Sequence, residues 1–327
     1  MAVGTETQTL LAEQGAANAQ FLLGLHYANA PEPECDQALA TAYFRRAALL
    51  GHAAAQFNLG VRYAKGKGVA RDPVRAILWY TRSAEQGNAR AQNNLGECYA
   101  NGRGLDRNDA QAIVWYRRAA EQGEPNAQVN LGGCYAHGRG LERNDAQAVL
   151  WFRRAAEQGN ASAQYNLGIC YDEGRGVGRN PAAAAIWYKL SAEQGNARAQ
   201  FNLGICYATG EGVAHDPATA AQWYESAAKQ GDASAQFNLG LCYALGTGRP
   251  HQQAAAIKWW QRAAEQGEVN AQYNLGLCHE QGRGLPPNRT QAILWYQRAA
   301  AQGDANALSK LRELSPRPVR TGLAKIR

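Results

Sequence analysis

Residues 199–207 have the sequence AQFNLGICY, and nearly the same letters stand at residues 163–171 and 235–243. The glutamine of this stretch recurs every 36 residues along the chain, at Gln20, Gln56, Gln92, Gln128, Gln164, Gln200, Gln236 and Gln272. A fixed period of this size is typical of proteins built from stacked supersecondary units. A stack also accommodates 327 residues without one large core, because each unit buries its apolar face against its neighbours.

The letters between two successive glutamines predict two helices in each unit. In residues 88–123, apolar letters recur at helical spacing over residues 89–101, which predicts the first helix, here called the A helix. Asn108 is a favoured N-cap for a second helix, the B helix, which we expect to end at Gly123. Gly96, inside the A helix, is expected to let a neighbouring helix approach closely.

The predicted fold class is therefore all-α: an α/α superhelical solenoid of about eight 36-residue helix-turn-helix repeats with capping half-repeats. We expect an N-terminal capping segment over residues 1–15, in which a remnant helix packs on the first unit. Eight repeats are expected over residues 16–303, followed by a capping helix over residues 304–314. Residues 315–327 hold four cations and no acid, and are expected to form a basic, disordered tail.

A longer motif can be written for the whole unit: A-x-A-Q-x-N-L-G-x-x-Y-x-x-G-x-G-V, followed by D/N-P-x-x-A-x-x-W-Y-x-x-A-A-x-Q-G. Residues 196–231 follow it almost letter for letter. This motif resembles the Sel1-like repeat, a relative of the tetratricopeptide repeat, and the resemblance covers roughly residues 9–314. It implies a superhelix that acts as an adaptor, holding partner proteins in signalling, protein quality control or bacterial envelope and exopolysaccharide regulation.

The resemblance also has a branch with a different activity. A cysteine-rich group of Sel1-like proteins carries disulfides between its paired helices and is associated with β-lactam binding. The present chain lacks the two cysteines per unit of that branch. A small-molecule-binding or hydrolytic protein of this kind is therefore the disfavoured alternative, beside a purely structural repeat array.

Composition and charge limit the classes of partner. The formal net charge is +7, and four of the cations lie in the predicted tail, so the repeats lack the concentrated basic face that nucleic-acid binding requires. No stretch approaches the roughly 18 uninterrupted apolar residues of a membrane span. Residues 1–8 lack the basic and apolar regions of a secretory signal. We expect no nucleic-acid partner, no membrane span and a cytoplasmic location.

The cysteines and histidines do not form a recognisable catalytic or metal site. One cysteine column repeats every 36 residues, at Cys98, Cys134, Cys170, Cys206, Cys242 and Cys278. A disulfide needs Cα atoms within about 7 Å, and zinc needs four converging ligands, whereas successive repeats place these positions about 10 Å apart or more. We therefore expect small, buried thiols. The sequence contains no catalytic motif, so we expect no catalytic residue, no metal and no cofactor.

A stripe on the A helices is the candidate partner-binding site. Tetratricopeptide-like stacks line their concave groove with A helices, and by that resemblance the groove would hold Asn130, Asn166, Asn202, Asn238, Asn274, Tyr165, Phe201, Phe237, Tyr273, Ile169, Ile205 and Leu241. Amide side chains suit the backbone of an extended peptide, and the apolar columns suit its side chains. Equally, the aromatic column could pack on the neighbouring A helix while each asparagine bonds within the stack. Since the apolar letters gather in repeats five to eight, we expect the partner there.

A second column of cations lies in the loops between the helices of a unit. It comprises Arg103, Arg139 and Arg175, with Arg107, Arg143 and Arg179 beside them. Such a basic ridge would suit an acidic partner. The more frequent alternative is a solvated edge without a binding role.

Overall fold

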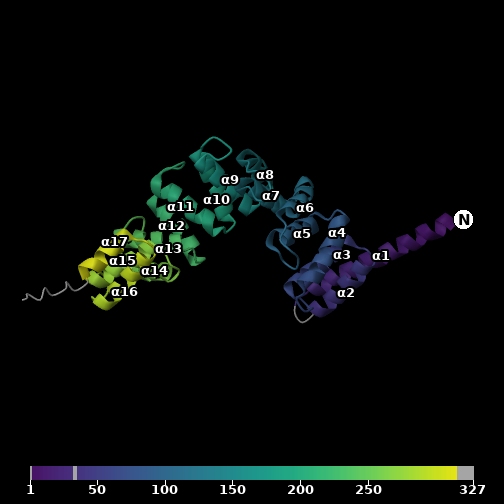
Figure 1. The fold of residues 1–327 in the computed structure, drawn as a ribbon, viewed down its shortest axis with the longest axis horizontal. Helices are drawn as coiled ribbons and strands as arrows, with labels where there is room; N and C mark the ends of the chain where they lie inside the picture. The colour runs from purple at the N-terminus through teal and green to yellow at the C-terminus, as the bar shows by residue number, and fades with distance from the viewer. Residues whose placement is uncertain (1, 32–34, 315–327) are drawn as a thin grey trace, which may run out of the picture. The chain divides into compact units, whose positions relative to one another are not determined.

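The computed structural model describes residues 2–31 and 35–314, with side chains from residue 15 onward; the predicted tail lies outside this part. Seventeen helices and no strand occur in the described residues. The chain divides into two compact units, Met1–Arg179 and Asn180–Arg327. Each unit consists of helix pairs in which A and B helices alternate, which confirms the all-α repeat fold (Figure 1).

In the first unit the A helices have odd numbers and the B helices even numbers. They are α1 (Ala2–Asn29), α2 (Gln37–Leu49), α3 (Ala53–Lys65), α4 (Pro73–Glu85), α5 (Ala89–Asn101), α6 (Asp109–Glu121), α7 (Pro125–His137), α8 (Asp145–Glu157) and α9 (Ala161–Glu173). The second unit comprises α10 (Pro181–Glu193), α11 (Ala197–Thr209), α12 (Pro217–Lys229), α13 (Ala233–Leu245), α14 (Gln253–Glu265), α15 (Val269–Gln281), α16 (Arg289–Ala301) and α17 (Ala305–Leu314).

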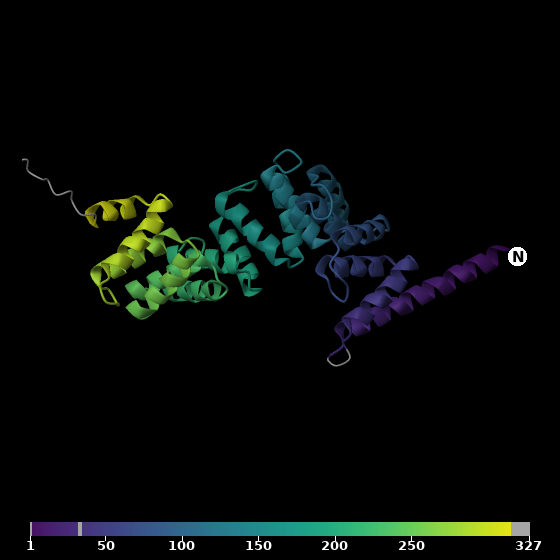
Figure 2. The ribbon, with the colours of Figure 1, turned by 60° about the horizontal axis from the view of Figure 1, so that its bottom comes forward.

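Within each unit, an A helix that is followed by a B helix packs on that B helix, and each B helix packs on the next A helix. Both orientations of the ribbon show these neighbours side by side (Figures 1 and 2). The first helix differs from the expectation of a separate remnant helix. Gly15 does not interrupt α1, which runs unbroken from Ala2 to Asn29 and extends past the helix that it pairs with.

Local signals set the helix ends. The Asn108 side chain accepts a hydrogen bond from the backbone N–H of Gln111 at 3.0 Å, so α6 starts where the sequence predicts. At the other end, Gly123 has φ +90, a conformation that residues with a Cβ adopt only at a cost. The A helix α5 likewise ends at Gly102, which has φ +64.

The glycine inside each A helix is a packing device. A Cβ added to Gly96 would lie 2.7 Å from the ring of Tyr116, and the same holds at Gly60 with Tyr80 at 2.6 Å. The A helix can therefore contact the B-helix ring directly, as the sequence predicts. The ring that contacts the glycine belongs to the residue directly after the tryptophan of the B helix, as Tyr116 follows Trp115. In five of the described repeats the tryptophan itself is covered by an arginine, as where Arg118 lies 4.7 Å from the Trp115 ring centre.

The glutamine that defines the repeat joins three helices. Gln92 in α5 is buried, and its Nε2 donates to the carbonyl of Ala84 at the end of α4. Its Oε1 accepts from Nε2 of Gln122, the C-cap of α6, at 2.7 Å. The same two bonds are made by Gln56, Gln128, Gln200, Gln236 and Gln272. Each glutamine thus fixes its own repeat to the end of the preceding one.

Glycines in the inter-helix loop set the distance between repeats. Gly176 has φ +67, and a Cβ there would lie 2.2 Å from the carbonyl oxygen of Asp145, at the start of α8. Gly178, two residues later, has nothing within 4 Å of such a Cβ and no positive φ. The loop therefore tolerates a side chain at position 178 but not at position 176.

We expect Gly176→Ala to lower the free energy of unfolding by about 2–5 kcal/mol, the sum of a left-handed non-glycine residue and backbone overpacking. Gly178→Ala is the matched control and should change it by less than about 0.5 kcal/mol. Urea denaturation followed by circular dichroism measures both values. Equal stability of the two variants would contradict the proposed loop contact.

The first repeat lacks one of the glutamine bonds. Gln20 Oε1 is buried and has no hydrogen-bond partner in the described part of the chain. The position that supplies the donor in other repeats is Leu50, the C-cap of α2, which is 47% exposed. An unpaired buried acceptor costs free energy, so this departure weakens the first repeat.

Leu50→Gln should supply the absent donor and raise stability by about 1 kcal/mol. Because α1 and α2 are terminal elements, amide hydrogen exchange of these helices is the appropriate measurement. Leu49→Gln, at the neighbouring exposed position, serves as the control and should leave exchange unchanged. Equal slowing in both variants would show that general polarity, and not the Gln20 bond, is responsible.

Candidate functional site

The predicted groove residues lie half-buried along the A helices. This holds for Asn130, Asn166, Asn202, Asn238, Asn274, Tyr165, Phe201, Phe237, Tyr273, Ile169 and Leu241, while Ile205 is 38% exposed. Part of each aromatic ring contacts a B helix: the Phe201 and Tyr224 centroids are 5.9 Å apart, and those of Tyr273 and Tyr296 are 5.7 Å apart. The aromatic column therefore packs on its own repeat along one side and keeps another side accessible.

The asparagine column divides into two kinds of residue. Asn130 Nδ2 donates to Asn93 Oδ1 at 2.9 Å, a bond between successive A helices, and Asn238 donates to the Ser234 carbonyl of its own helix. The side chains of Asn202 and Asn274 make no hydrogen bond to any other residue that the structure describes. Asn130 and Asn238 thus bond within the stack, as one of the two alternatives expected, whereas partner binding by the other asparagines stays a prediction.

Cavities form where a residue of the A helix differs in type from the residues at the equivalent position of the other repeats. Asn93 stands where most repeats have an aromatic residue, and Gly133 stands where later repeats have isoleucine or leucine. Next to Asn93 lies a cavity of about 410 Å³, here called the amide cavity. Its lining is Phe57, Arg90, Asn93, Asn94, Glu124, Pro125, Asn126, Gln158, Gly159 and Asn160. Beside Gly133, a guanidinium nitrogen of Arg139 lies 4.0 Å from the position that a Cβ would take.

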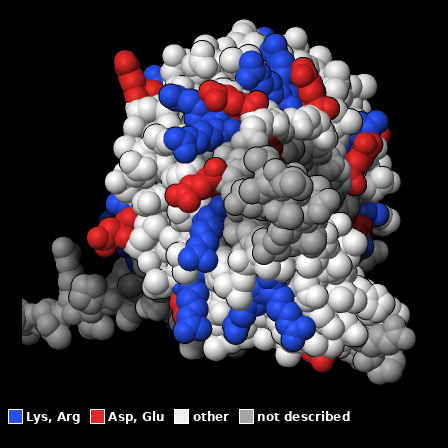
Figure 3. All heavy atoms as spheres, turned by 90° about the vertical axis from the view of Figure 1, so that its right-hand side faces the viewer, with Lys and Arg blue, Asp and Glu red and all other residues white. Residues whose placement is uncertain are grey.

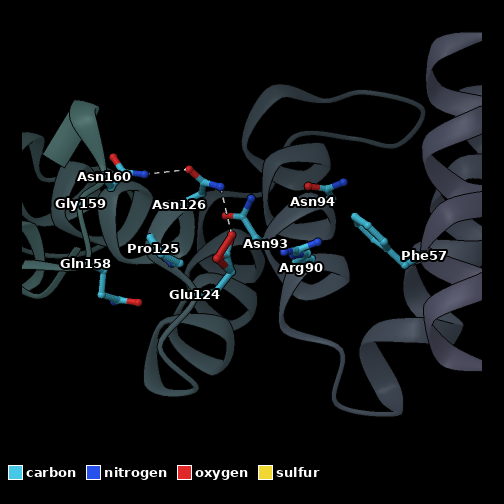
Figure 4. Close-up of a pocket in the computed structure, with 10 residues that line it drawn as sticks. All are labelled: Phe57, Arg90, Asn93, Asn94, Glu124, Pro125, Asn126, Gln158, Gly159 and Asn160. Carbon is cyan, nitrogen blue, oxygen red and sulfur yellow. Dashed lines mark hydrogen bonds between the residues drawn. The ribbon is translucent and has the colours of Figure 1, made fainter. Parts of the chain in front are cut away.

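Figure 4 shows the amide cavity between Phe57 at one end and Asn160 at the other. Asn160 Nδ2 donates to Asn126 Oδ1, and Asn126 Nδ2 donates to Glu124 Oε1, both at 3.1 Å. These bonds hold the amides in fixed orientations. Arg90 lines the same cavity and forms no ion pair with a described residue.

A second cavity, of about 520 Å³, is here called the cation-rimmed cavity. It is lined by Phe57, Asn58, Val61, Ala64, Lys65, Arg71, Pro73, Ala76, Tyr80, Asn94, Glu97, Cys98 and Arg103. A smaller one, of about 190 Å³, is lined by Glu97, Ala100, Asn101, Asp109, Ala112, Tyr116, Asn130, Cys134 and Arg139. All three belong to the first unit.

Three of the residues predicted from the sequence line these cavities: Asn130, Arg103 and Arg139. The sequence interpretation did not identify Lys65, Glu124 or Asn126 as site residues. The sequence signal that could have indicated a cavity was the polar Asn93 and the small Gly133 at positions where other repeats have apolar side chains. In the folded repeats Asn93 lines the amide cavity.

The predicted basic ridge is partly neutralised. Arg107 and Arg143 each lie 2.7 Å from the aspartate two residues on, and Arg175 lies 2.6 Å from Glu173. The hydrogen bond from Arg107 lowers the pKa of Asp109. Arg179 donates to the Asp172 carbonyl, while Arg103 and Arg139 have no carboxylate within 4.0 Å among the described residues. On the face in Figure 3, several Lys and Arg side chains lie next to Asp or Glu side chains.

Comparison with known protein families gives eight consecutive matches to the Sel1 repeat, at residues 17–52, 53–88, 89–124, 125–160, 161–196, 197–232, 233–268 and 269–304. The chain belongs to the Sel1-repeat family. Comparison with curated proteins gave no match. The membership agrees with the observed helix pairs, because each match spans one A helix and one B helix.

Two solved structures share this Sel1-repeat fold. The protective antigen c5321 of uropathogenic Escherichia coli, which displays an SLR fold, is 38% identical with a TM-score of 0.81; the match covers 94% of this chain and 66% of that one. This chain therefore spans just under two thirds of the length of that relative. A Sel1 repeat protein from Oxalobacter formigenes is 33% identical with a TM-score of 0.68, covering 94% of this chain and 90% of that one.

The six column cysteines of this Sel1-repeat protein are buried free thiols, as the sequence predicts. Burial raises the pKa of Cys98 and of Cys170 to about 11, from an ordinary value near 9. Among residues 2–31 and 35–314, no three His, Cys, Asp or Glu side chains are grouped as metal ligands. The same residues contain no helix long and apolar enough to cross a membrane.

Because a raised thiol pKa favours the neutral form, native Cys98 and Cys170 should react with iodoacetamide at pH 8 roughly 100-fold more slowly than in urea. Cys35 is half-buried and serves as the internal control, which should be alkylated in the native protein. Peptide mass spectrometry after timed quenching measures each site. Native alkylation of Cys98 as fast as that of Cys35 would contradict the described burial.

Proposed function

We propose that this Sel1-repeat protein is a non-enzymatic scaffold that binds an extended segment of a partner polypeptide along its A helices. Sel1-repeat proteins serve in general as protein-interaction scaffolds. The observation that carries the proposal is the half-exposed column of amides with unused bonding capacity, represented by Asn202 and Asn274. A peptide backbone presents alternating donors and acceptors, which an amide side chain matches with two N–H groups and one carbonyl.

The apolar columns supply the second part of the binding surface. Phe201 and Tyr273 each use one side of the ring for packing within the repeat. Ile205, one turn after Phe201 in α11, is 38% exposed. Half-exposed aromatic and aliphatic groups beside oriented amides suit alternate side chains of an extended peptide.

We further infer that the protein acts in a reducing compartment such as the cytoplasm, as an adaptor in a signalling or regulatory assembly. The supporting observation is the state of the cysteines: six buried thiols, free of disulfides, suit a compartment that keeps thiols reduced. No step of the proposed function involves catalysis, a metal or a cofactor.

The test uses the full chain as bait in a cell extract, followed by purification of a captured protein and measurement of its affinity by calorimetry. Replacing Asn202 and Asn274 by alanine should weaken that affinity about 10-fold, since each lost hydrogen bond contributes about 0.5–1.5 kcal/mol. The two side chains make no internal hydrogen bond, so the fold should remain unchanged by circular dichroism.

The matched control replaces Gln261 and Gln297, exposed amides on the B helices α14 and α16, by alanine. This variant should bind like the unmodified chain. Unchanged affinity in the A-helix variant, or equal losses in both variants, would refute binding along the A helices. A chain that captures no partner would favour the purely structural array.

A further inference from the structure

The cation-rimmed cavity combines an apolar floor with a positively charged edge. Phe57, Val61 and Tyr80 form part of its floor, and Tyr80 is only 4% exposed. Lys65, Arg71 and Arg103 line its edge and are exposed to solvent. None of these three has a carboxylate within 4.0 Å in the described part of the chain.

The absence of a partner for Arg71 has a cause in the sequence. In the next two repeats the equivalent cations, Arg107 and Arg143, are held by Asp109 and Asp145, two residues further on. After Arg71 that position is Pro73, which has no charge. Asp72 beside it pairs with Arg75 at 3.2 Å. The cavity therefore keeps Arg71 as an unneutralised cation, whereas the equivalent arginines of the next two repeats are neutralised by aspartates.

Glu97 is the carboxylate that lines this cavity among the described residues. Its Oε1 accepts a hydrogen bond at 3.1 Å from Nδ2 of Asn93, one turn earlier in the same helix. Three cations against one carboxylate leave a local excess of positive charge around an apolar hollow. A volume of about 520 Å³ lies within the range of binding pockets.

The amide cavity lies directly next to the cation-rimmed cavity, because Phe57 and Asn94 line both. Asn93, Asn94 and Asn126 then continue the surface with amide groups. A ligand that fills the apolar hollow can therefore extend along a row of backbone-compatible amides. This arrangement favours a chain-like ligand over a compact one.

We propose that the cation-rimmed cavity of repeats two and three is the specificity site of this protein. It binds an acidic peptide segment in which an apolar side chain enters the hollow and flanking Asp or Glu carboxylates contact Lys65, Arg71 and Arg103. This inference rests on the proposed function and places the selective contacts in the first unit. The observation that carries it is the charge complementarity around a built apolar hollow.

The test selects ligands from a random dodecapeptide display library with the full chain as bait. We expect enrichment of peptides that combine a leucine or an aromatic residue with Asp or Glu on either side. One enriched peptide, labelled with fluorescein, is then measured by fluorescence polarisation. Its affinity should fall at least about 10-fold when its acidic residues become amides, when its apolar residue becomes serine, or when the bait carries Arg71→Glu with Arg103→Glu.

The control bait carries Lys258→Glu with Arg283→Glu, which makes the same change in net charge at exposed positions of the second unit. It should bind the peptide like the unmodified chain. Enriched peptides that are neutral or basic, or acidic peptides that both double variants bind equally well, would overturn this inference and leave the scaffold function standing. A selection that enriches no peptide over a blank surface would count against both.

Discussion

The buried glutamine at the start of each A helix is the interaction on which the repeat depends. It donates to the last turn of the preceding B helix and accepts from the C-cap of its own B helix, as Gln92 does with Ala84 and Gln122. A buried amide is stable only when its donors and acceptor are paired, so neighbouring repeats must keep one spacing and one register. This requirement explains why the glutamine recurs at a fixed interval, and why the first repeat, with Leu50 at the donor position, is left with an unpaired acceptor.

Glycines also fix the packing of the repeats, because they have no side chain at positions where the backbone lies against a neighbouring helix. Gly96 lets the Tyr116 ring lie on the A helix, and Gly176 lets its loop reach the backbone at the start of α8. Each unit is thus held by contacts with its immediate neighbours, as is general for repeat proteins. Side chains that these contacts do not use remain on the solvent side of the A helices and in the loops.

The proposed binding surface lies where a repeat departs from its neighbours. Asn93 and Gly133 remove apolar bulk from two successive A helices, and Pro73 removes the carboxylate that would neutralise Arg71. None of these changes disturbs the glutamine bonds at Gln92 and Gln128. The fold can therefore carry an irregular surface on a regular core, which is what selective recognition by a repeat protein requires.

The sequence by itself determined the helix pairs, their ends and the family, because these follow from local signals: the 36-residue period, N-caps such as Asn108 and glycines such as Gly123. It also predicted the buried cysteines. Only the tertiary structure decided that α1 is unbroken through Gly15, that Asn130 bonds to Asn93 while Asn202 does not, and that hollows form around Phe57. The last two of these properties depend on side chains about 36 residues apart, whose relative positions arise from packing and which no local pattern specifies.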